Sequence, residues 1–401
     1  MLEFFSGSSS AVNSKSAVRE CLDLAFGEDG GGDASIVFVH STMGHNMPQS
    51  HAAIREYCPN AEIVGCTGSG VIGREGVSEN MRALAVMAVV GDECAVVQNA
   101  GLTGSNSQQL ATETAQALQA KLDGINMIYV ITAGMDVAGD QVIAGIESVF
   151  GPEIMLFGAS AGDNGKAART FQFHSDKVLE DGITMVGFSD PTLELLTGVH
   201  HGSLPIEGMT FEVTKSDGNQ IVELDGKPAW PTLLGRLGLP PETEPGSVMG
   251  ITGLGEDLGP DEAAEYDNTQ ILRVPIRVSD DHQTFFVHST CLEGTRLTLM
   301  QRDEKHIFDG VDRLMARMTD ALDGREPVAV FHADCMARGR MTFNKILKDE
   351  IIAKIQYPLA GDDGVPWLGV YGFAEFSRLS GRNRFHNYTT SLYPLVRRKS
   401  A

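Results

Sequence analysis

The sequence is poor in basic residues. Its 401 residues include 31 Lys and Arg against 53 Asp and Glu, which leaves a formal net charge of −22. Nucleic-acid binding needs clustered cations to neutralise phosphates, and docking on an anionic membrane surface needs them as well. The charge balance therefore argues against both kinds of partner, and we expect no nucleic-acid binding.

Long apolar runs and paired cysteines are also missing. The longest uninterrupted apolar stretch, Ala83–Val90, is far shorter than the roughly 18 residues that a membrane-spanning helix requires. The first residues, 1–15, lack a basic segment followed by an apolar core, so we expect neither a secretion signal nor membrane insertion. The six cysteines are widely separated and form no CxxC pair, which argues against a zinc ribbon or a disulfide framework. These absences predict a cytoplasmic protein.

A repeated pattern of helices and strands organises the rest of the chain. The order helix, strand, helix, strand, turn, strand begins near Ser14, again near Ser107 and a third time near Glu304. Glycines recur within the copies: Gly65-x-x-Gly68-x-Gly70 aligns with Gly369-x-x-Gly372-x-Ala374, and Gly158-Ala-Ser-Ala-Gly162 fits within a residue or two. Internal repeats indicate a fold assembled from similar units. We predict a mixed α/β fold of two domains, with layered mixed sheets and flanking helices.

The region between the second and third copies follows a different pattern. Residues 191–298 contain short apolar runs separated by turn signals, among them Asp217-Gly218, which is typical of a hairpin. We place the domain boundary near residue 225. The predicted N-terminal domain is therefore 1–225, the C-terminal domain is 226–396, and a basic tail occupies 397–401.

Two short motifs resemble enzyme signatures without their structural context. Gly68–Gly73 matches GxGxxG, but the dinucleotide fingerprint must open a helix, and here a polar segment leads into a strand. Gly158–Gly162 matches GxSxG around Ser160, but a nucleophile elbow needs a strand-to-helix turn, and an extended segment follows Asp163. A serine hydrolase using Ser160 is kept as an alternative to the non-enzymatic interpretation.

Five residues near the C-terminus are candidates for a site. Glu375, His386 and Asn387 flank a turn between two apolar strands, so they should approach one another across a hairpin. A carboxylate beside an imidazole can orient the ring or shift its pKa, and a buried hydrogen-bond network that only fixes the hairpin is the alternative. Cys335 and Arg338 follow another buried strand, where arginine could lower the pKa of the thiol. A buried structural cysteine is the competing interpretation.

A single dipeptide permits haem binding. Cys58-Pro59 is of the kind in which a thiolate binds haem, although proline at this place also ends a helix. The histidines show no spacing typical of a metal site, and there is no CxxCH sequence. Cys58 is thus the candidate haem ligand, and haem is the candidate cofactor.

The late residues also carry a family resemblance. The FIST C-terminal signature, a G-F-x-x-x-G-E strand followed by F-H-N-x-T, resembles Gly369, Val370, Ala374, Glu375, Phe385, His386, Asn387 and Thr389. Val370, Ala374 and Tyr388 depart from the residues that are common there. In the first half, Gly65-Cys66-Thr67, Gly158–Asp163 and Asp181-Gly182 resemble the FIST N-terminal module. The resemblance covers nearly the full length.

This resemblance implies a bacterial sensory protein rather than an enzyme. Such a protein binds a small molecule, with amino acids proposed for the family, and signals to a separate histidine kinase or cyclic-di-GMP enzyme in a two-component system. Stand-alone members of the NosP type, which resemble this chain in length, bind haem and sense nitric oxide for a histidine kinase. The expected ligand-binding residues are Glu375, His386, Asn387, Cys335, Arg338, Gly65, Cys66, Thr67, Ser160 and Asp163.

Overall fold

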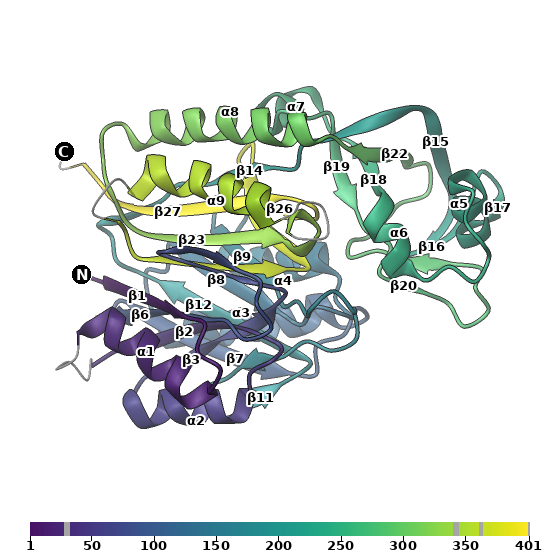
Figure 1. Cartoon of the computed structure of the whole chain (residues 1–401). Helices are drawn as coiled ribbons and strands as arrows, with labels where there is room; N and C mark the ends of the chain where they lie inside the picture. Colours follow the sequence, from purple (N-terminus) through teal and green to yellow (C-terminus); the bar gives the residue numbers. More distant parts are fainter. Residues whose placement is uncertain (28–32, 340–344, 361–363, 400–401) are drawn as a thin grey trace.

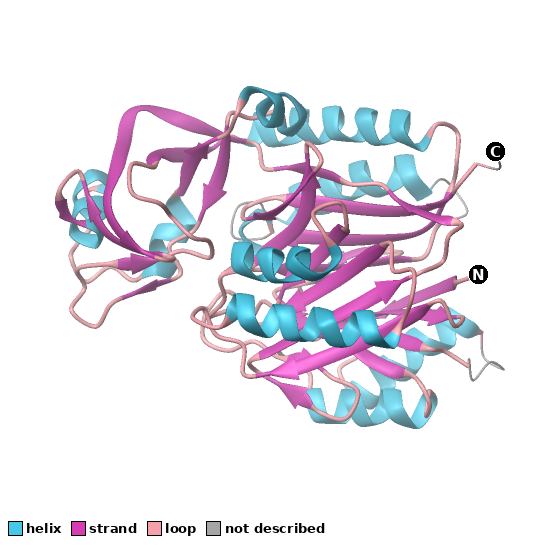
Figure 2. Ribbon diagram, turned by 180° about the vertical axis from the view of Figure 1, so that it is seen from behind, coloured by secondary structure: helices cyan, strands magenta, loops and turns pink. Residues whose placement is uncertain are grey.

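The computed structural model describes residues 1–27, 33–339, 345–360 and 364–399. They form a body of three similar α/β modules and a smaller β-rich subdomain, which projects from one end of the body (Figure 1). Seen from behind, the strands occupy the interior of the body and helices cover its outer faces (Figure 2). The predicted mixed α/β fold with flanking helices is confirmed.

Each module has the predicted order of helix, strand, helix, strand, turn and strand, so the predicted repeat is confirmed. The first module contains β1 (Glu3–Ser9), α1 (Ser14–Phe26), β2 (Ile36–Thr42), α2 (Met47–Tyr57), β3 (Glu62–Gly68), β4 (Val71–Gly73), β5 (Gly76–Ser78) and β6 (Leu84–Val90). The second contains β7 (Cys94–Ala100), α3 (Ser107–Lys121), β8 (Met127–Thr132), α4 (Gly139–Phe150), β9 (Met155–Ser160), β10 (Gln172–Phe173), β11 (Val178–Leu179) and β12 (Gly182–Phe188). The third contains β13 (Leu193–Leu195), β14 (Gly198–His200), α8 (Glu304–Leu322), β23 (Pro327–Cys335), α9 (Lys345–Ala360), β24 (Trp367–Gly372), β25 (Ala374–Leu379), β26 (Arg382–His386) and β27 (Thr390–Arg397).

Each module is built around one parallel strand pair joined by a helix. The pairs are β2 with β3, β8 with β9, and β23 with β24, crossed by α2, α4 and α9 respectively. The repeated glycines lie at the same register of these pairs, because Gly65 faces Val39 and Gly158 faces Val130. A β carbon would lie 1.8 Å from the Val39 carbonyl oxygen at Gly65, and 2.0 Å from that of Val130 at Gly158. Close backbone approach therefore explains why glycine recurs here.

The three modules exchange their hairpins. The hairpin β4–β5 of the first module pairs with β24 of the third, β10–β11 of the second pairs with β3 of the first, and β25–β26 of the third pairs with β9 of the second. Every sheet of the body is therefore completed by strands from another module. The exchange closes the modules into one interlocked unit, which neither the first nor the last part of the chain could form alone.

The centre of the body is a cluster of aromatic side chains from all three modules. The ring centroids of Phe38, Tyr129 and Phe331, one from each module, lie 5.1–5.3 Å apart in each pair. Phe157 and Tyr393 extend the cluster with centroids 5.5 Å apart. All are buried, and aromatic pairs at these separations contribute about 0.5–1.5 kcal/mol beyond their area burial. The core thus holds the three modules together.

Side-chain caps fix where several helices begin. Asn13, Asn46 and Asp303 each accept a hydrogen bond from the backbone N–H three residues further on, and so begin α1, α2 and α8. Such a cap satisfies a donor that the first turn leaves unpaired. None of the described helices combines the length and apolar character needed to cross a membrane.

The subdomain is inserted between β14 and α8. It contains β15 (Ser203–Asp217), β16 (Gln220–Leu224), β17 (Lys227–Pro228), α5 (Ala229–Leu237), α6 (Pro245–Ile251), β18 (Gly253–Asp257), α7 (Pro260–Tyr266), β19 (Gln270–Arg273), β20 (Arg277–Val278), β21 (Phe285–Phe286) and β22 (Arg296–Arg302). Strands β15 and β16 form the predicted hairpin. Asp217 is the last residue of β15, the turn consists of Gly218 and Asn219, and Gly218 has a φ of +58°. Only β15 and β22, its first and last strands, connect the subdomain to the body along the chain.

The proposed domain boundary and tail fall at distinct places in this architecture. Residue 225 lies in the turn between β16 and β17, within the inserted subdomain. Arg397, the first residue of the predicted basic tail, is the last residue of β27. Ser400 and Ala401 lie outside the described residues.

Candidate functional site

A recess lies where the body meets the inserted subdomain. Its empty volume is about 560 Å³, which includes space that is open to solvent. The body contributes Gly134, Met135, Gly165, Ala167, Cys335, Met336, Ala337, Phe373 and Tyr388. The subdomain contributes Gly246, Met249, Val274, Ile276 and His288. A concave, mostly apolar space with a few polar groups is the usual form of a small-molecule site.

A histidine in the wall is supported from behind by an asparagine. His288 Nε2 lies 3.2 Å from the carbonyl oxygen of Gly134, which it reaches as a donor. The amide nitrogen of Asn387 lies 3.5 Å from His288 Nδ1 and donates to the Phe373 carbonyl at 3.2 Å. Burial lowers the pKa of His288 to about 4, so the ring is neutral at pH 7. Asn387 Oδ1 is buried and has no hydrogen-bond partner among the described residues.

A tyrosine links the two sides of the recess. The hydroxyl of Tyr388 lies 3.0 Å from the carbonyl oxygen of Met249 and 2.9 Å from that of Thr252, both in the subdomain. The guanidinium of Arg302 lies 5.5 Å from the centroid of its ring. Tyr388 has a φ of +60°, which non-glycine residues seldom adopt. Body and subdomain are thus joined at the wall of the recess itself.

Glu375 and His386 face each other directly in the β25–β26 register, but they bond elsewhere. Glu375 Oε2 accepts from the Thr389 hydroxyl at 2.7 Å and its backbone N–H at 3.4 Å. The hydroxyl of Tyr266 lies 3.3 Å from His386 Nδ1. Both side chains are fully buried, and neither contributes to the wall of the recess. They form a polar layer behind it.

Burial gives this pair unusual protonation states. It raises the pKa of Glu375 well above its ordinary value, despite the Thr389 hydrogen bonds that lower it. It lowers the pKa of His386 to about 3. The hairpin therefore holds a carboxyl group whose ionised form is disfavoured by burial beside an imidazole that is neutral at pH 7.

Glu375→Gln is expected to stabilise the protein at alkaline pH. A raised folded-state pKa means that stability is present below the unfolded pKa of about 4.5 and is lost as the pH rises towards the folded value. Glutamine keeps an oxygen for Thr389 without a proton to lose, so the variant should gain at least about 1 kcal/mol over the wild type at pH 8. Chemical denaturation from pH 5 to pH 9 measures the difference. A carboxylate that is ionised in the folded state would instead make the variant the less stable protein at pH 8.

Cys335 is in the wall of the recess, whereas Arg338 is turned away into a polar cluster. The Arg338 side chain donates to Asp334 Oδ1 and to the His201 carbonyl oxygen, both at 3.1 Å. Burial, with the nearby Glu375 adding to it, raises the pKa of the Cys335 thiol well above its ordinary value. The idea that Arg338 activates this thiol is therefore wrong, since burial dominates and the guanidinium is engaged elsewhere.

Asp163 organises a loop that forms part of the recess. Its Oδ1 accepts from the N–H groups of Gly165 and Lys166 at 2.9 Å and of Ala167 at 3.1 Å, and its Oδ2 accepts from that of Ala168 at 2.8 Å. A fifth, longer bond comes from Arg169 at 3.5 Å. Asp163 is almost completely buried, so its carboxylate shapes the wall of the recess from behind.

Apart from Asp163, the predicted residues of the first two modules lie away from the recess. Thr67 joins these modules, because its hydroxyl donates to the Gly162 carbonyl at 2.8 Å and accepts from the Phe171 N–H at 2.9 Å. Gly65 and Cys66 lie within β3, and burial raises the pKa of the Cys66 thiol. Five of the ten predicted residues lie neither in the wall of the recess nor directly behind it, namely Gly65, Cys66, Thr67, Ser160 and Arg338.

Ser160 does not have the surroundings of a nucleophile. Its hydroxyl is fully buried and lies 2.7 Å from that of Thr132, with no histidine among its described hydrogen-bond partners. The chain after it continues into a loop and then β10, not into a helix. The nucleophile-elbow geometry required by the hydrolase alternative is therefore missing at Ser160.

Cys58 does not fit a haem ligand. Its side chain is 1% exposed and packs in the apolar cluster beneath α1 and α2. Burial raises the pKa of its thiol to about 11, which disfavours the thiolate that would bind iron. Among the described residues, no group of three or more His, Cys, Asp or Glu side chains could hold a metal ion.

The subdomain half of the recess was not anticipated from the sequence. His288 follows the apolar run Phe285–Val287, a strand signal, and this was the one local hint. Met249, Val274 and Ile276 carry no motif and become wall residues only through the way the inserted subdomain lies against the body.

The fold is that of a mixed α/β protein built from interlocked modules, with a recess of the form that small-molecule sites usually have. Residues 33–227 match the FIST N domain and residues 237–378 match the FIST C domain. The chain belongs to the FIST-domain proteins, whose domains are sensory, ligand-binding parts of signalling proteins.

Other comparisons are distant. No curated protein matches the sequence. A solved cyanuric acid hydrolase from A. caulinodans is 8% identical, with the whole of both chains covered and a TM-score of 0.40. A chorismatase is 9% identical, with 99% of this chain and 98% of the other covered and a TM-score of 0.36. At these scores the likeness carries no functional argument.

Proposed function

We propose that this protein senses a small molecule bound in the recess and passes the signal to a separate protein, such as a histidine kinase or a cyclic-di-GMP enzyme. The observation that carries the proposal is that the walls of one recess come from two bodies joined along the chain only by β15 and β22. We also propose that the chain divides into two domains near residue 225, that the protein is cytoplasmic, and that its signal is received by a separate partner protein.

The position of the recess suggests how binding is transmitted. Its walls belong to the body and to the subdomain, so a ligand that contacts both favours the arrangements of the two that fit it. Occupancy is then coupled to the position of the subdomain, because the ligand binds one arrangement more tightly than the others.

The predicted polar residues take different parts in this proposal. Cys335 contacts the ligand directly, and Asn387 supports the wall through His288 and the Phe373 carbonyl. Asp163 holds the loop that carries Gly165 and Ala167. Glu375 and His386 fix the hairpin behind the wall. This is the role of a buried hydrogen-bond network, which the sequence offers as the alternative to ligand binding.

Gly246→Phe is expected to abolish ligand binding without disturbing the fold. Gly246 lies in α6 at the edge of the recess, and a β carbon there would meet nothing within 4 Å. A phenyl group can therefore cover the opening without a clash. Gly250→Phe is the matched control, since Gly250 lies on the same helix, has the same free space and is not in the wall.

The measurement is a thermal-shift screen of the twenty amino acids and of small neutral aromatics. A compound that raises Tm in the wild type should lose at least about nine-tenths of its effect in Gly246→Phe and keep it in Gly250→Phe. A compound that shifts all three proteins equally binds elsewhere, and this result would refute the recess as the sensing site.

A further inference from the structure

We propose that the recess takes an uncharged, mainly apolar ligand and rejects zwitterions such as free amino acids. This inference rests on the proposed function, since it specifies the chemical class of the ligand at the same site. It separates two candidates that the resemblance alone does not, because a zwitterion adds two charged groups, which the wall has to accommodate, to the apolar group that it shares with its neutral analogue.

The wall contains no charged side chain. None of the fourteen described wall residues is Asp, Glu, Lys or Arg. Three of them can titrate, namely His288, Cys335 and Tyr388. Burial lowers the pKa of the histidine to about 4 and raises those of the thiol and the phenol, so all three are neutral at pH 7.

Several charged groups close to the wall are already engaged. Arg302 donates to the Met249 carbonyl oxygen at 2.6 Å and to that of Ala337 at 3.4 Å, from outside the recess. Arg338 is bound to Asp334, and Arg273 forms an ion pair with Glu256 at 2.8 Å. The Asp163 carboxylate accepts backbone N–H groups. A charged ligand group would therefore have to compete with an existing pair to reach these groups. Arg338 Nη2 has no hydrogen-bond partner among the described residues, but Arg338 is not in the wall. Asp136 and Lys166 adjoin wall residues in the chain, but they are exposed to water and are not in the wall either.

Most of the wall is suited to apolar contact. Met135, Met249 and Met336 supply flexible, polarizable side chains that adapt to irregular shapes. Phe373, Val274 and Ile276 add rigid apolar surface. An apolar ligand gains from burial against these groups roughly in proportion to the area that it hides from water.

The physical consequence is that the recess should bind neutral ligands much more tightly than charged ones. A carboxylate or ammonium group that leaves water without a partner pays a desolvation cost that apolar contacts do not offset. A free amino acid carries both groups, so the desolvation cost applies to each of them. A neutral molecule with the same side group keeps the apolar contacts and avoids this cost.

Three matched series test the preference. They consist of indole, tryptamine, indole-3-acetate and tryptophan; benzyl alcohol, phenethylamine, phenylacetate and phenylalanine; and isoamyl alcohol, isoamylamine, isovalerate and leucine. Ligand-observed NMR detects weak binding, and titration calorimetry gives the affinity of each compound that binds. Every measurement is repeated on Gly246→Phe and Gly250→Phe, so that binding in the recess is separated from binding elsewhere.

We expect recess binding, defined as binding that Gly246→Phe removes and Gly250→Phe keeps, from neutral members only. Their charged partners should bind at least about 100-fold more weakly. If tryptophan, phenylalanine or leucine shows recess binding as tight as that of its neutral partner, this inference is overturned while the proposed function stands. If no member of any series shows recess binding, the proposed function fails and the inference fails with it.

Discussion

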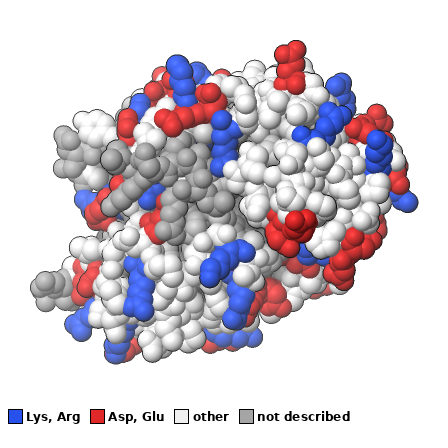
Figure 3. Space-filling model, turned by 45° about the vertical axis from the view of Figure 1, so that its right-hand side comes forward, with Lys and Arg blue, Asp and Glu red and all other residues white. Residues whose placement is uncertain are grey.

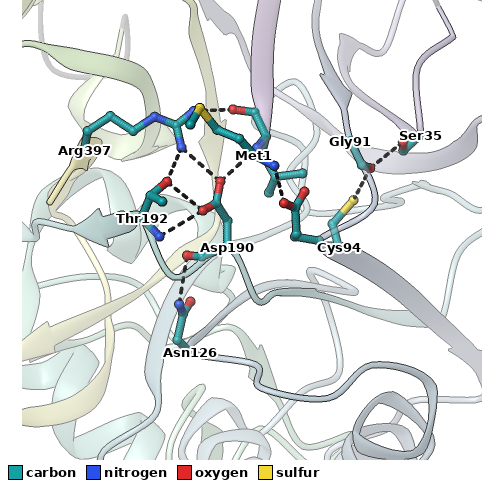
Figure 4. Close-up of polar contacts among 10 residues, drawn as sticks. Met1, Ser35, Gly91, Cys94, Asn126, Asp190, Thr192 and Arg397 are labelled. Carbon is teal, nitrogen blue, oxygen red and sulfur yellow. Dashed lines mark hydrogen bonds and ion pairs between the residues drawn. The ribbon is translucent and has the colours of Figure 1, made fainter.

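Asp190→Ala is expected to cost about 3–5 kcal/mol of folding free energy, because this carboxylate joins all three modules. Its Oδ2 accepts from the Leu2 N–H at 2.8 Å and pairs with Arg397 at 2.9 Å, and its Oδ1 accepts the N–H and hydroxyl of Thr192 (Figure 4). Leu2 precedes β1 and Arg397 ends β27, so Asp190 fastens the two ends of the chain to the end of β12. Chemical denaturation measures the loss. Asp92→Ala, an exposed aspartate before β7, should change stability by less than about 0.5 kcal/mol.

The same carboxylate should impose a pH dependence at the acid end. Burial alone would raise the pKa of Asp190, but hydrogen bonds from Thr192 and Leu2 and the pair with Arg397 outweigh it and lower the pKa to about 2. A lowered pKa means that the stabilisation is present above the unfolded value of about 3.8 and is lost as the pH falls towards 2. The difference in stability between the wild type and Asp190→Ala should therefore shrink as the pH falls towards 2. Parallel pH profiles would show that the carboxylate contributes nothing through its charge.

A double variant distinguishes an ion pair from general damage. Removing Asp190 alone leaves the partly buried Arg397 without its partner, whereas Arg397→Leu with Asp190→Ala removes both charges. The double variant should be destabilised by less than the sum of the single ones. A strictly additive result would mean that the two residues act independently.

The repeated architecture could be predicted because its signals are local. Apolar periodicity gave the helices, and Gly65, Gly158 and Gly369 marked the same point of three parallel pairs. The exchange of hairpins could not be predicted in this way. Strand β4 pairs with β24, about 300 positions later, and the periodicity of a short apolar strand does not say which distant edge it joins.

The candidate site shows the same division between local and non-local information. Cys335 and the Phe385–Thr389 segment could be found because they carry a recognisable pattern at the end of strands. The subdomain half of the wall could not, because Met249 and Val274 are ordinary apolar residues until the inserted segment packs against the body. Several patterned residues, Thr67 and Glu375 among them, hold backbone or hairpin in place. The motifs therefore indicated where the chain needs a fixed geometry. They were a less reliable guide to the atoms that line the recess.

Asp163→Ala is expected to loosen the loop of residues 165–169 and to weaken ligand binding in the recess to a similar extent. The carboxylate accepts five backbone N–H groups from residues 165–169, so alanine leaves these donors without partners and should cost about 3 kcal/mol. Hydrogen exchange at these amides should accelerate at least about 100-fold, and recess binding of the neutral probes should fall in parallel. Asp176→Ala, on the exposed turn between β10 and β11, is the control and should change neither quantity.

Asp163→Asn tests whether this residue contacts the ligand or builds the wall. Asparagine keeps one oxygen but places an NH₂ group where the N–H groups of Ala168 and Arg169 now donate, so part of the loop should loosen. If Asp163 acts only through the loop, amide protection and probe affinity should fall by similar factors across Asn and Ala. If it contacts the ligand, Asn should lose affinity while the amides stay protected. A carboxylate already holding five donors has little capacity left for a ligand, and we therefore expect the two losses to move together.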